Sequence, residues 1–189
     1  MDVVEALKIV KKALTIERYE HTERVVDTAR KLANIYNEDM EKAEIAAALH
    51  DYAKYRDPNE LKRWILREKG LPKDLLQYHH ELWHGPVGAY LLRVEHDVTT
   101  TSILDAITYH TTGRANMTTL DKIIFLADYI EPGRNFPGLE EVRNEAWKDL
   151  DKGCYLALKN TIMFLMNKNQ PIYPNTFQAY NDLNKRIKE

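Results

Sequence analysis

An imidazole and a carboxylate stand side by side at His50 and Asp51, near the end of the helix-forming run 44–54. Because adjacent residues of a helix diverge by about 100°, both side chains can bind one ion if that ion lies just off the helix. The two oxygens of Asp51 also allow it to bridge two ions. Ala46 and Ala47 lie one turn before His50, and their small side chains let other helices approach with ligands of their own. The pair therefore predicts a metal site between helices.

A second His-Asp pair, His96 and Asp97, serves as an internal control. It follows the polar end of a predicted helix, precedes the run 98–101, and has no face of small residues behind it. The ordinary interpretation of such a pair is a helix-end histidine beside a solvated aspartate. We therefore predict that His96 and Asp97 bind no metal.

Three further candidate ligands lie on apolar helical faces. His21 belongs to a stripe of apolar residues in the predicted helix 21–36, and His110 ends a similar stripe in another helix. A histidine satisfied by one hydrogen bond in the core is the alternative for each. Asp128 lies on a third stripe, and a buried carboxylate is costly unless a cation neutralises it. Asp128 therefore needs either a metal or a core arginine.

His80, Glu81 and His84 form the His-Glu-x-x-His spelling of helical zinc peptidases. In those enzymes both histidines face one zinc from a continuous helix. Pro86 has no N–H to donate and disfavours the α conformation in the residue before it, so we expect the helix to break at His84. We find no third ligand placed as a zinc peptidase requires, and we disfavour that function. His84 then stands at the mouth of the next helix.

The assembled candidates offer imidazole and carboxylate without thiolate, and they are His21, His50, Asp51, His84, His110 and Asp128. This set suits iron, manganese or zinc. We predict that one ion is held by His21, His50, Asp51 and Asp128. His84 and His110 then either hold a second ion about 3.5–4 Å away, with Asp51 as the bridge, or donate hydrogen bonds to phosphate. Two ions at that spacing clamp an in-line displacement at phosphorus.

Apolar residues at helical spacing predict the elements that position these ligands, and no stretch of the chain predicts a strand. We expect Ser102 to cap one helix, Thr118 or Thr119 to cap the next, and Gly153 to interrupt a later one. Helices are predicted over 2–14, 21–36, 44–54, 58–70, 71–84 and 139–168. Three more are predicted to follow Pro86, Ser102 and Thr118, and a last helix starts from Phe177. The expected architecture is an all-α, single-domain orthogonal helical array.

The composition limits the partners and the compartment. At 189 residues and 44% hydrophobic, the chain can build one sizeable core, which favours a single domain over 1–189. The net charge of -2 provides no general basic field and argues against nucleic acid as the main partner. Cys154 is the only cysteine, which fits a reducing cytoplasm. We expect neither a signal peptide nor a membrane span, and the oligomeric state, a homodimer included, stays open.

The order of the six candidates resembles the pattern that defines the HD superfamily of metal-dependent phosphohydrolases, over about residues 18–132. A narrower likeness lies in the runs 110–114 and 126–134 and in the tail at 174–181, which are similar to the bacterial HD-domain symmetrical bis(5'-nucleosyl)-tetraphosphatases. All six ligand positions match. The resemblance implies the HD-domain fold, with a metal-binding core at about 18–132 and C-terminal helices in 139–189 that pack on it.

The resemblance further implies an iron-dependent hydrolase that splits diadenosine tetraphosphate into two ADP molecules. A hydroxide activated by the metal is the expected nucleophile, with catalytic roles for Asp51 and Lys54. The phosphates need cationic partners, and those available are Arg24, Lys54, Arg114 and Arg134. The remaining predicted substrate contacts are His84, His110, Thr111, Tyr173 and Asn175, the last two beside a nucleobase. The alternatives are another nucleotide phosphohydrolase of the superfamily and a non-catalytic nucleotide-binding HD domain.

Overall fold

The computed structural model describes residues 1–188, and the regular structure in that range is helical throughout. The first part of the chain forms α1 (Val3–Ala13), α2 (Ile16–Ile35), α3 (Met40–Leu49), α4 (Pro58–Arg67) and two short 3₁₀ helices, η1 (Lys73–Gln77) and η2 (His80–Leu82). The second part forms α5 (His84–His96), α6 (Thr101–Tyr109), α7 (Thr119–Ile130), α8 (Leu139–Ala146), α9 (Leu150–Asn167) and α10 (Pro174–Arg186). The predicted single-domain, all-α array is confirmed.

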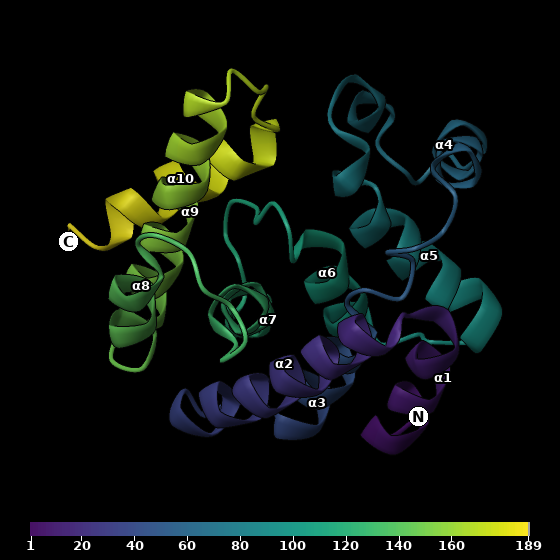
Figure 1. Cartoon of the computed structure of the whole chain (residues 1–189), viewed down its shortest axis with the longest axis horizontal. Helices are drawn as coiled ribbons and strands as arrows, with labels where there is room; N and C mark the ends of the chain where they lie inside the picture. Colours follow the sequence, from purple (N-terminus) through teal and green to yellow (C-terminus); the bar gives the residue numbers. More distant parts are fainter. Residues whose placement is uncertain (189) are drawn as a thin grey trace.

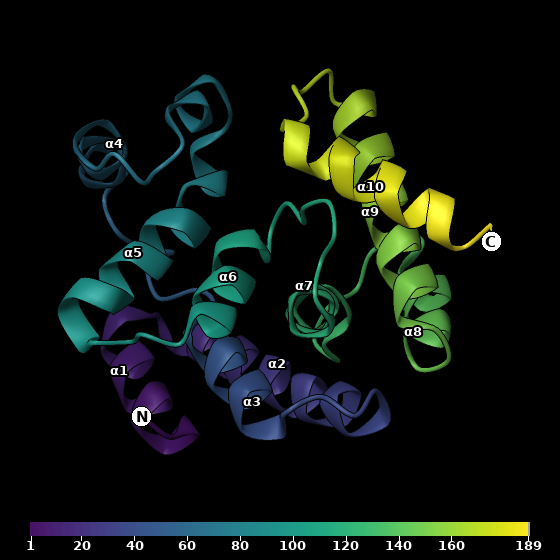
Figure 2. The same ribbon diagram turned by 180° about the vertical axis from the view of Figure 1, so that it is seen from behind.

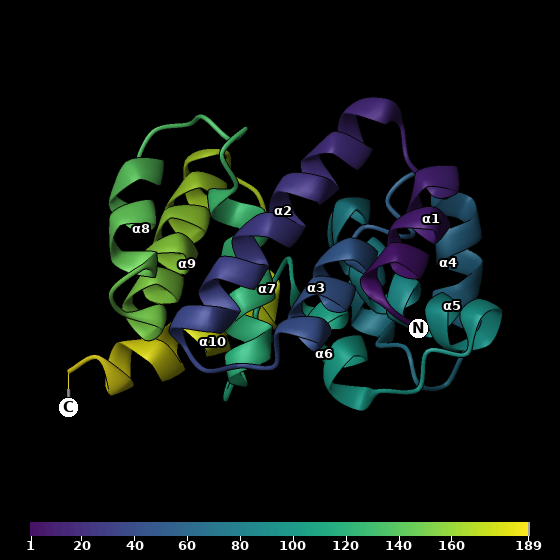
Figure 3. The ribbon, with the colours of Figure 1, turned by 90° about the horizontal axis from the view of Figure 1, so that it is seen from below.

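Helices α6 and α7 lie at the centre of the molecule, with α2 and α3 below them in Figure 1. On one side α8 and α10 pack on α9, which contacts α7, and on the other side α5 packs on α6. Figure 2 shows the same arrangement from behind, and in Figure 3 α2 runs diagonally across α7. Four helices, α2, α3, α6 and α7, therefore meet in the middle. Within residues 1–188, none of the helices is long and apolar enough to cross a membrane.

The alanine-rich helix α3 is the closely packed element of this centre. Ala46, Ala47 and Ala48 are completely buried, and α3 contacts α2, α6 and α7. Small side chains keep the distance between helix axes short, because they place little volume between the backbones. The interpretation of these alanines from the sequence is thereby borne out. The close packing brings residues of α2 and α7 within reach of the end of α3.

Two helix boundaries near the centre differ from the prediction. α2 begins at Ile16, five residues before His21, because the Thr15 hydroxyl accepts a hydrogen bond from the backbone N–H of Arg18 (3.3 Å). α3 ends at Leu49, and residues 50–55 form tight turns in which the Lys54 N–H donates to the Asp51 carbonyl (2.8 Å). The prediction of a helix over the whole of 44–54 was wrong at its end. Lys54 therefore projects from a turn.

The segment 71–84 was predicted to be helical, and this was wrong. It forms the two short helices η1 and η2 with a break between them. The indole N–H of Trp83 donates to the Leu75 carbonyl (2.8 Å), so a hydrogen bond between the two parts replaces the bonds of a continuous helix. α5 begins at His84, where the break before Pro86 was expected.

Of the two caps predicted for α6 and α7, the cap of α7 is confirmed and the cap of α6 is wrong. Thr118 caps α7, and its hydroxyl accepts from the Asp121 N–H (3.1 Å) while the Asp121 carboxylate accepts from the Thr118 N–H (3.0 Å). That prediction is confirmed. The residue before α6 is Thr100 rather than Ser102, which lies inside the first turn.

The interruption predicted at Gly153 lies elsewhere, between Ala146 and Leu150. The Asp149 side chain accepts a hydrogen bond from the Lys152 N–H (3.0 Å) and so starts a new helix, α9. Gly153 lies within α9, where a Cβ atom would approach the Cα of Ala146 to 2.9 Å. The glycine permits close packing of α8 on α9 and does not break the helix.

Candidate metal centre

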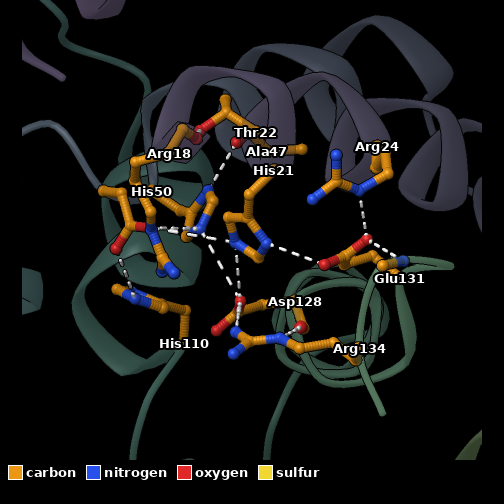
Figure 4. Close-up of polar contacts among 12 residues, drawn as sticks. Arg18, His21, Thr22, Arg24, Ala47, His50, His110, Asp128, Glu131 and Arg134 are labelled. Carbon is orange, nitrogen blue, oxygen red and sulfur yellow. Dashed lines mark hydrogen bonds and ion pairs between the residues drawn. The ribbon is translucent and has the colours of Figure 1, made fainter. Parts of the chain in front are cut away.

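One half of the cluster joins α2, the end of α3 and α7. His21 comes from α2, His50 and Asp51 follow α3, and Asp128 lies in the last turn of α7. His21 Nε2 lies 3.0 Å from Asp128 Oδ1, and His50 Nε2 lies 3.1 Å from Asp51 Oδ2 (Figure 4). Cross distances of 3.9 Å (His50 to Asp128) and 4.0 Å (His21 to Asp51) close the group. Four potential ligand atoms thus converge on one point.

The other half of the cluster lies on the second oxygen of Asp51. His84, the first residue of α5, places Nε2 3.1 Å from Asp51 Oδ1, and His110, just after α6, places Nε2 3.8 Å from it. The two Nε2 atoms are 3.1 Å apart. Gly85 permits this approach, because a Cβ there would lie 2.9 Å from the Thr108 carbonyl oxygen of α6. Asp51 therefore connects the two halves of the cluster.

Each histidine has its outer nitrogen fixed by an acceptor. The Nδ1–H groups of His50, His84 and His110 donate to the carbonyls of Ala47 (2.6 Å), Glu81 (2.6 Å) and Ile107 (2.7 Å). A carbonyl can only accept, so Nδ1 carries a proton and Nε2 is the ring nitrogen that faces the cluster. His21 Nδ1 instead lies 3.0 Å from the Glu131 carboxylate. All four imidazoles are thus oriented as metal ligands are.

Three of the inner atoms have no hydrogen bonds. His21 Nε2, His50 Nε2 and Asp51 Oδ1 are buried without any donor or acceptor partner in the described chain. Lone pairs that face one another in a buried site repel and leave each polar atom unsatisfied. Three overlapping groups of these side chains have their ligand atoms within 4.8 Å of one another. The residues present therefore fit a divalent metal ion.

The charge states also suit a cation. Burial alone would raise the pKa of Asp51, but His50 and His84 hold it well below its usual range. Desolvation would likewise raise the pKa of Asp128, but the hydrogen bond with His21 keeps that pKa well below its usual range. Burial, with the nearby His84 and His50, lowers the pKa of His110 to about 3. The cluster thus offers two ionised carboxylates and a neutral imidazole, which are the forms that bind metals.

Two residues at this centre were missed in the sequence. The Arg18 guanidinium forms an ion pair with Asp51 Oδ2, and Glu131 accepts from His21 and from Arg24 Nε (2.6 Å). Glu131 also accepts from the Gly133 N–H (2.6 Å). Both lie one helical turn from a predicted ligand, Arg18 before His21 and Glu131 after Asp128. That spacing was the available signal.

The predicted cationic residues lie in different surroundings. Arg134 Nη2 binds Asp128 Oδ1 (2.6 Å), so the carboxylate has an arginine as well as histidines around it. Arg24 is bound to Glu131, beside His21, and Lys54 forms an ion pair with Glu81. The structure does not bring Arg114 to the cluster. Its guanidinium forms ion pairs that hold α6 and α7 together, with the carboxylates of Asp105 (3.0 Å) and Asp121 (2.8 Å).

The other predicted substrate contacts line three cavities, one of which, of about 310 Å³, is shared by Thr111 and Tyr173. Thr111 lines a cavity of about 230 Å³ together with His110 and Asp128, and its hydroxyl is buried without a partner in residues 1–188. Tyr173 and Asn175 line a different cavity of about 680 Å³, which none of the six cluster side chains borders. The Tyr173 hydroxyl donates to Asp74 (3.2 Å).

Within residues 1–188, neither of the two competing motifs brings three potential ligand atoms together. The His80 ring stacks on His79 with centroids 4.5 Å apart, and Glu81 forms its ion pair with Lys54, so only His84 of the peptidase-like motif reaches the cluster. His96 Nε2 lies 3.0 Å from the Tyr52 hydroxyl. Asp97 ends α5 with a left-handed backbone (φ 53°).

Comparison with known proteins agrees with this geometry. Residues 18–133 match the HD domain family. A symmetrical bis(5'-nucleosyl)-tetraphosphatase of Bacillus subtilis is 54% identical, with 96% of this chain and 97% of that protein aligned, and its counterpart in Staphylococcus aureus is 42% identical over the full length of both. A crystal structure from Clostridium acetobutylicum, described as a predicted HD superfamily hydrolase involved in NAD metabolism, superposes with a TM-score of 0.92 at 38% identity, covering 98% of each chain. The chain therefore belongs to the HD domain family and, within it, to the family of these tetraphosphatases.

Proposed function

We propose that this protein is a metal-dependent symmetrical bis(5'-nucleosyl)-tetraphosphatase, which hydrolyses diadenosine tetraphosphate to two molecules of ADP. Relatives with this name align over nearly the whole chain. The observation that carries the proposal is the convergence of the six side chains, in which His21 Nε2, His50 Nε2 and Asp51 Oδ1 are buried without hydrogen-bond partners in the described residues. Such a site needs a cation, and a polyphosphate substrate needs cations for its own charges.

In this proposal His21, His50, Asp51 and Asp128 hold one metal ion. His84 and His110, with Asp51 as the bridge, either hold a second ion or contact phosphate directly. Iron is the proposed metal, on the basis of the family resemblance, and manganese or zinc would also accept this ligand set. When bound, the metal supplies Lewis acidity toward a phosphoryl oxygen and lowers the pKa of a coordinated water.

The protein's own cations position the phosphates that flank the reacting one. Arg134 is one-third exposed and is held beside Asp128, so it faces both the cluster and solvent. Lys54 lies with His84 in the wall of another cavity that borders the cluster. Arg18 and Arg24 are tied to Asp51 and Glu131, and their role is to orient groups at the cluster. The proposed substrate is a dinucleoside polyphosphate, and the proposed compartment is a reducing cytoplasm.

The test is metal analysis combined with product analysis. The protein is purified without oxygen, its metal content is measured, and diadenosine tetraphosphate is supplied before and after chelation. We expect ADP as the sole nucleotide product, loss of activity on chelation, and recovery with ferrous iron. Asp51→Ala should abolish turnover and metal binding together, because Asp51 belongs to both halves of the cluster, whereas His96→Ala should affect neither. Nucleotide binding without turnover in any metal would contradict the proposal.

A further inference from the structure

A groove with cationic side chains lies between α1 and the segment that follows α3. Its volume is about 480 Å³, and one face of α1 lines it with Glu5, Lys8 and Lys12. Arg56, from the segment between α3 and α4, borders it as well. We call this cavity the α1 groove. Its wall sets two lysines and an arginine against one carboxylate, so it is a candidate site for an anion.

The two lysines of the α1 groove have no acidic partner. Lys8 and Lys12 are both exposed, and neither forms an ion pair in the part of the chain that the structure describes, although Glu5 lies only three residues before Lys8. By contrast, Lys42 in α3 pairs with Asp39 (3.0 Å). Like charges four residues apart on one face of a helix repel each other. A multivalent anion bound between Lys8 and Lys12 removes that repulsion.

The opposite wall of the α1 groove is fixed by hydrogen bonds. Arg56 Nη1 donates to the carboxylate of Glu60 (3.0 Å). Arg56 Nη2 donates to the carboxylate of Glu95 (2.7 Å) and to the Tyr52 hydroxyl (3.1 Å). Because the two carboxylates neutralise the guanidinium, Arg56 shapes the groove more than it attracts an anion. The free positive charge of the groove therefore comes from the two lysines of α1.

The α1 groove continues toward the His/Asp cluster. Tyr55 and Arg56 border both this groove and the cavity of about 230 Å³ that is lined by Lys54 and His84. His84 is a member of the cluster, and Tyr55 is 55% exposed at the boundary between the two cavities. A linear polyanion that contacts Lys54 can therefore extend past Tyr55 into the α1 groove. Cationic side chains that follow one another along a surface raise the local concentration of anions there.

We propose that the α1 groove is a second anion site, in which Lys8 and Lys12 bind neighbouring phosphate groups of a polyphosphate compound. Two flexible ammonium groups one helical turn apart can each donate to a phosphate, whereas a compound with a single phosphate uses only part of the groove. The ligand is either the far end of a polyphosphate chain held at the cluster or a separate phosphorylated compound. The binding itself does not depend on the reaction at the cluster.

The test is isothermal titration calorimetry of the purified, metal-containing protein with inorganic diphosphate. The double variant Lys8→Ala/Lys12→Ala should weaken binding in the α1 groove about 100-fold, or about tenfold for each lost charged hydrogen bond. Diphosphate binding at the cluster should stay unchanged. Glu5→Gln should tighten binding in the groove, because it removes the carboxylate that shares this face of α1.

Two further variants separate charge from structure. Lys8→Arg/Lys12→Arg keeps both positive charges and should keep diphosphate binding. Lys31→Ala/Lys62→Ala removes two exposed lysines that lie outside the groove, and it should bind diphosphate as the wild type does. Because Lys8 and Lys12 are exposed and alanine favours a helix, the alanine variant of α1 should fold normally, which circular dichroism checks.

Diphosphate binding that is the same in the wild type and in Lys8→Ala/Lys12→Ala would overturn the inference. Loss of one class of site in that variant supports it, and the KM for diadenosine tetraphosphate then identifies the ligand. A raised KM indicates the far end of the substrate, and an unchanged KM indicates a separate phosphorylated compound. A protein that binds diphosphate through the two lysines but does not cleave diadenosine tetraphosphate would contradict only the proposed function.

Discussion

The acceptor behind each imidazole determines what its inner nitrogen can bind. His50, His84 and His110 donate to backbone carbonyls, whereas His21 faces the carboxylate of Glu131. A carboxylate partner increases the basicity of the ring and fixes its orientation more strongly than a neutral carbonyl does. Burial would raise the pKa of Glu131, but hydrogen bonds from Arg24 and His21 hold that pKa below its usual range, so Glu131 is ionised. His21 is thus the most strongly supported of the four imidazoles.

Glu131→Gln tests this support directly. The amide keeps the size of the side chain but removes the negative charge between His21 and Arg24. We expect the affinity for the metal to fall about 10–100-fold, the usual effect of changing a partner behind a metal ligand. Titration against a competing chelator measures this change. Glu44→Gln, which breaks another Glu–Arg pair with Arg30, is the control and should keep wild-type affinity. Unchanged affinity in Glu131→Gln would show that its charge is dispensable.

At the scale of the helices, the ligands were predictable because each breaks an apolar pattern. His21, His110 and Asp128 are titratable residues on stripes whose other members pack in the core. Arg18 was missed because it lies before the predicted start of its helix. Glu131 was assigned to the loop after α7, where the structure also places it, and its contact with His21 joins residues far apart in the sequence. The capping hydroxyl of Thr15 sets the start of α2, and it was not used in the prediction.

The segment 71–84 shows where reasoning from local sequence fails. Its helical prediction rested on a start signal and on a motif read as helix. In the structure the bond from Trp83 to the Leu75 carbonyl and the contacts of η1 with α4 take the place of helical bonds. Contacts between residues distant in sequence therefore decide the conformation, and they are invisible to a window of neighbouring residues. The peptidase-like motif fails for the same reason.

Packing between α8 and α9 can be tested at Gly153. Alanine favours a helix more than glycine does, but a Cβ at this position would lie 2.9 Å from Ala146 Cα and 3.1 Å from a methyl of Leu126. We expect Gly153→Ala to lower the free energy of unfolding by about 1–2 kcal/mol, because overpacking exceeds the gain in helix propensity. Denaturant titration measures this. Gly70→Ala, with no neighbour within 4 Å, should be neutral or slightly stabilising. A stabilised Gly153→Ala would show that α8 can move away at little cost.

Across the whole molecule, two cavities border different members of the cluster. One cavity of about 230 Å³ is lined by His110, Asp128 and Arg134, and another of about 230 Å³ is lined by His84 and Lys54. Each cavity joins a cluster residue to a cationic residue, so a long polyanion bound over the cluster would meet a cation in either cavity. The first cavity also contains the aromatic pair of Tyr129 and Phe136.

This arrangement leads to a prediction about the bond that is cleaved. If the cluster holds one phosphate while Lys54 and Arg134 hold those beside it, the nucleoside end of the substrate determines which phosphate reaches the cluster. A diphosphate unit is then retained on one side, so diadenosine tetraphosphate should give only ADP. In isotope-labelled water, one of the two ADP molecules should carry the label on its terminal phosphate. Diadenosine triphosphate should react more slowly or give ADP and AMP, because the same diphosphate unit is measured from one end. AMP and ATP from the tetraphosphate would show that the base does not set the position of cleavage.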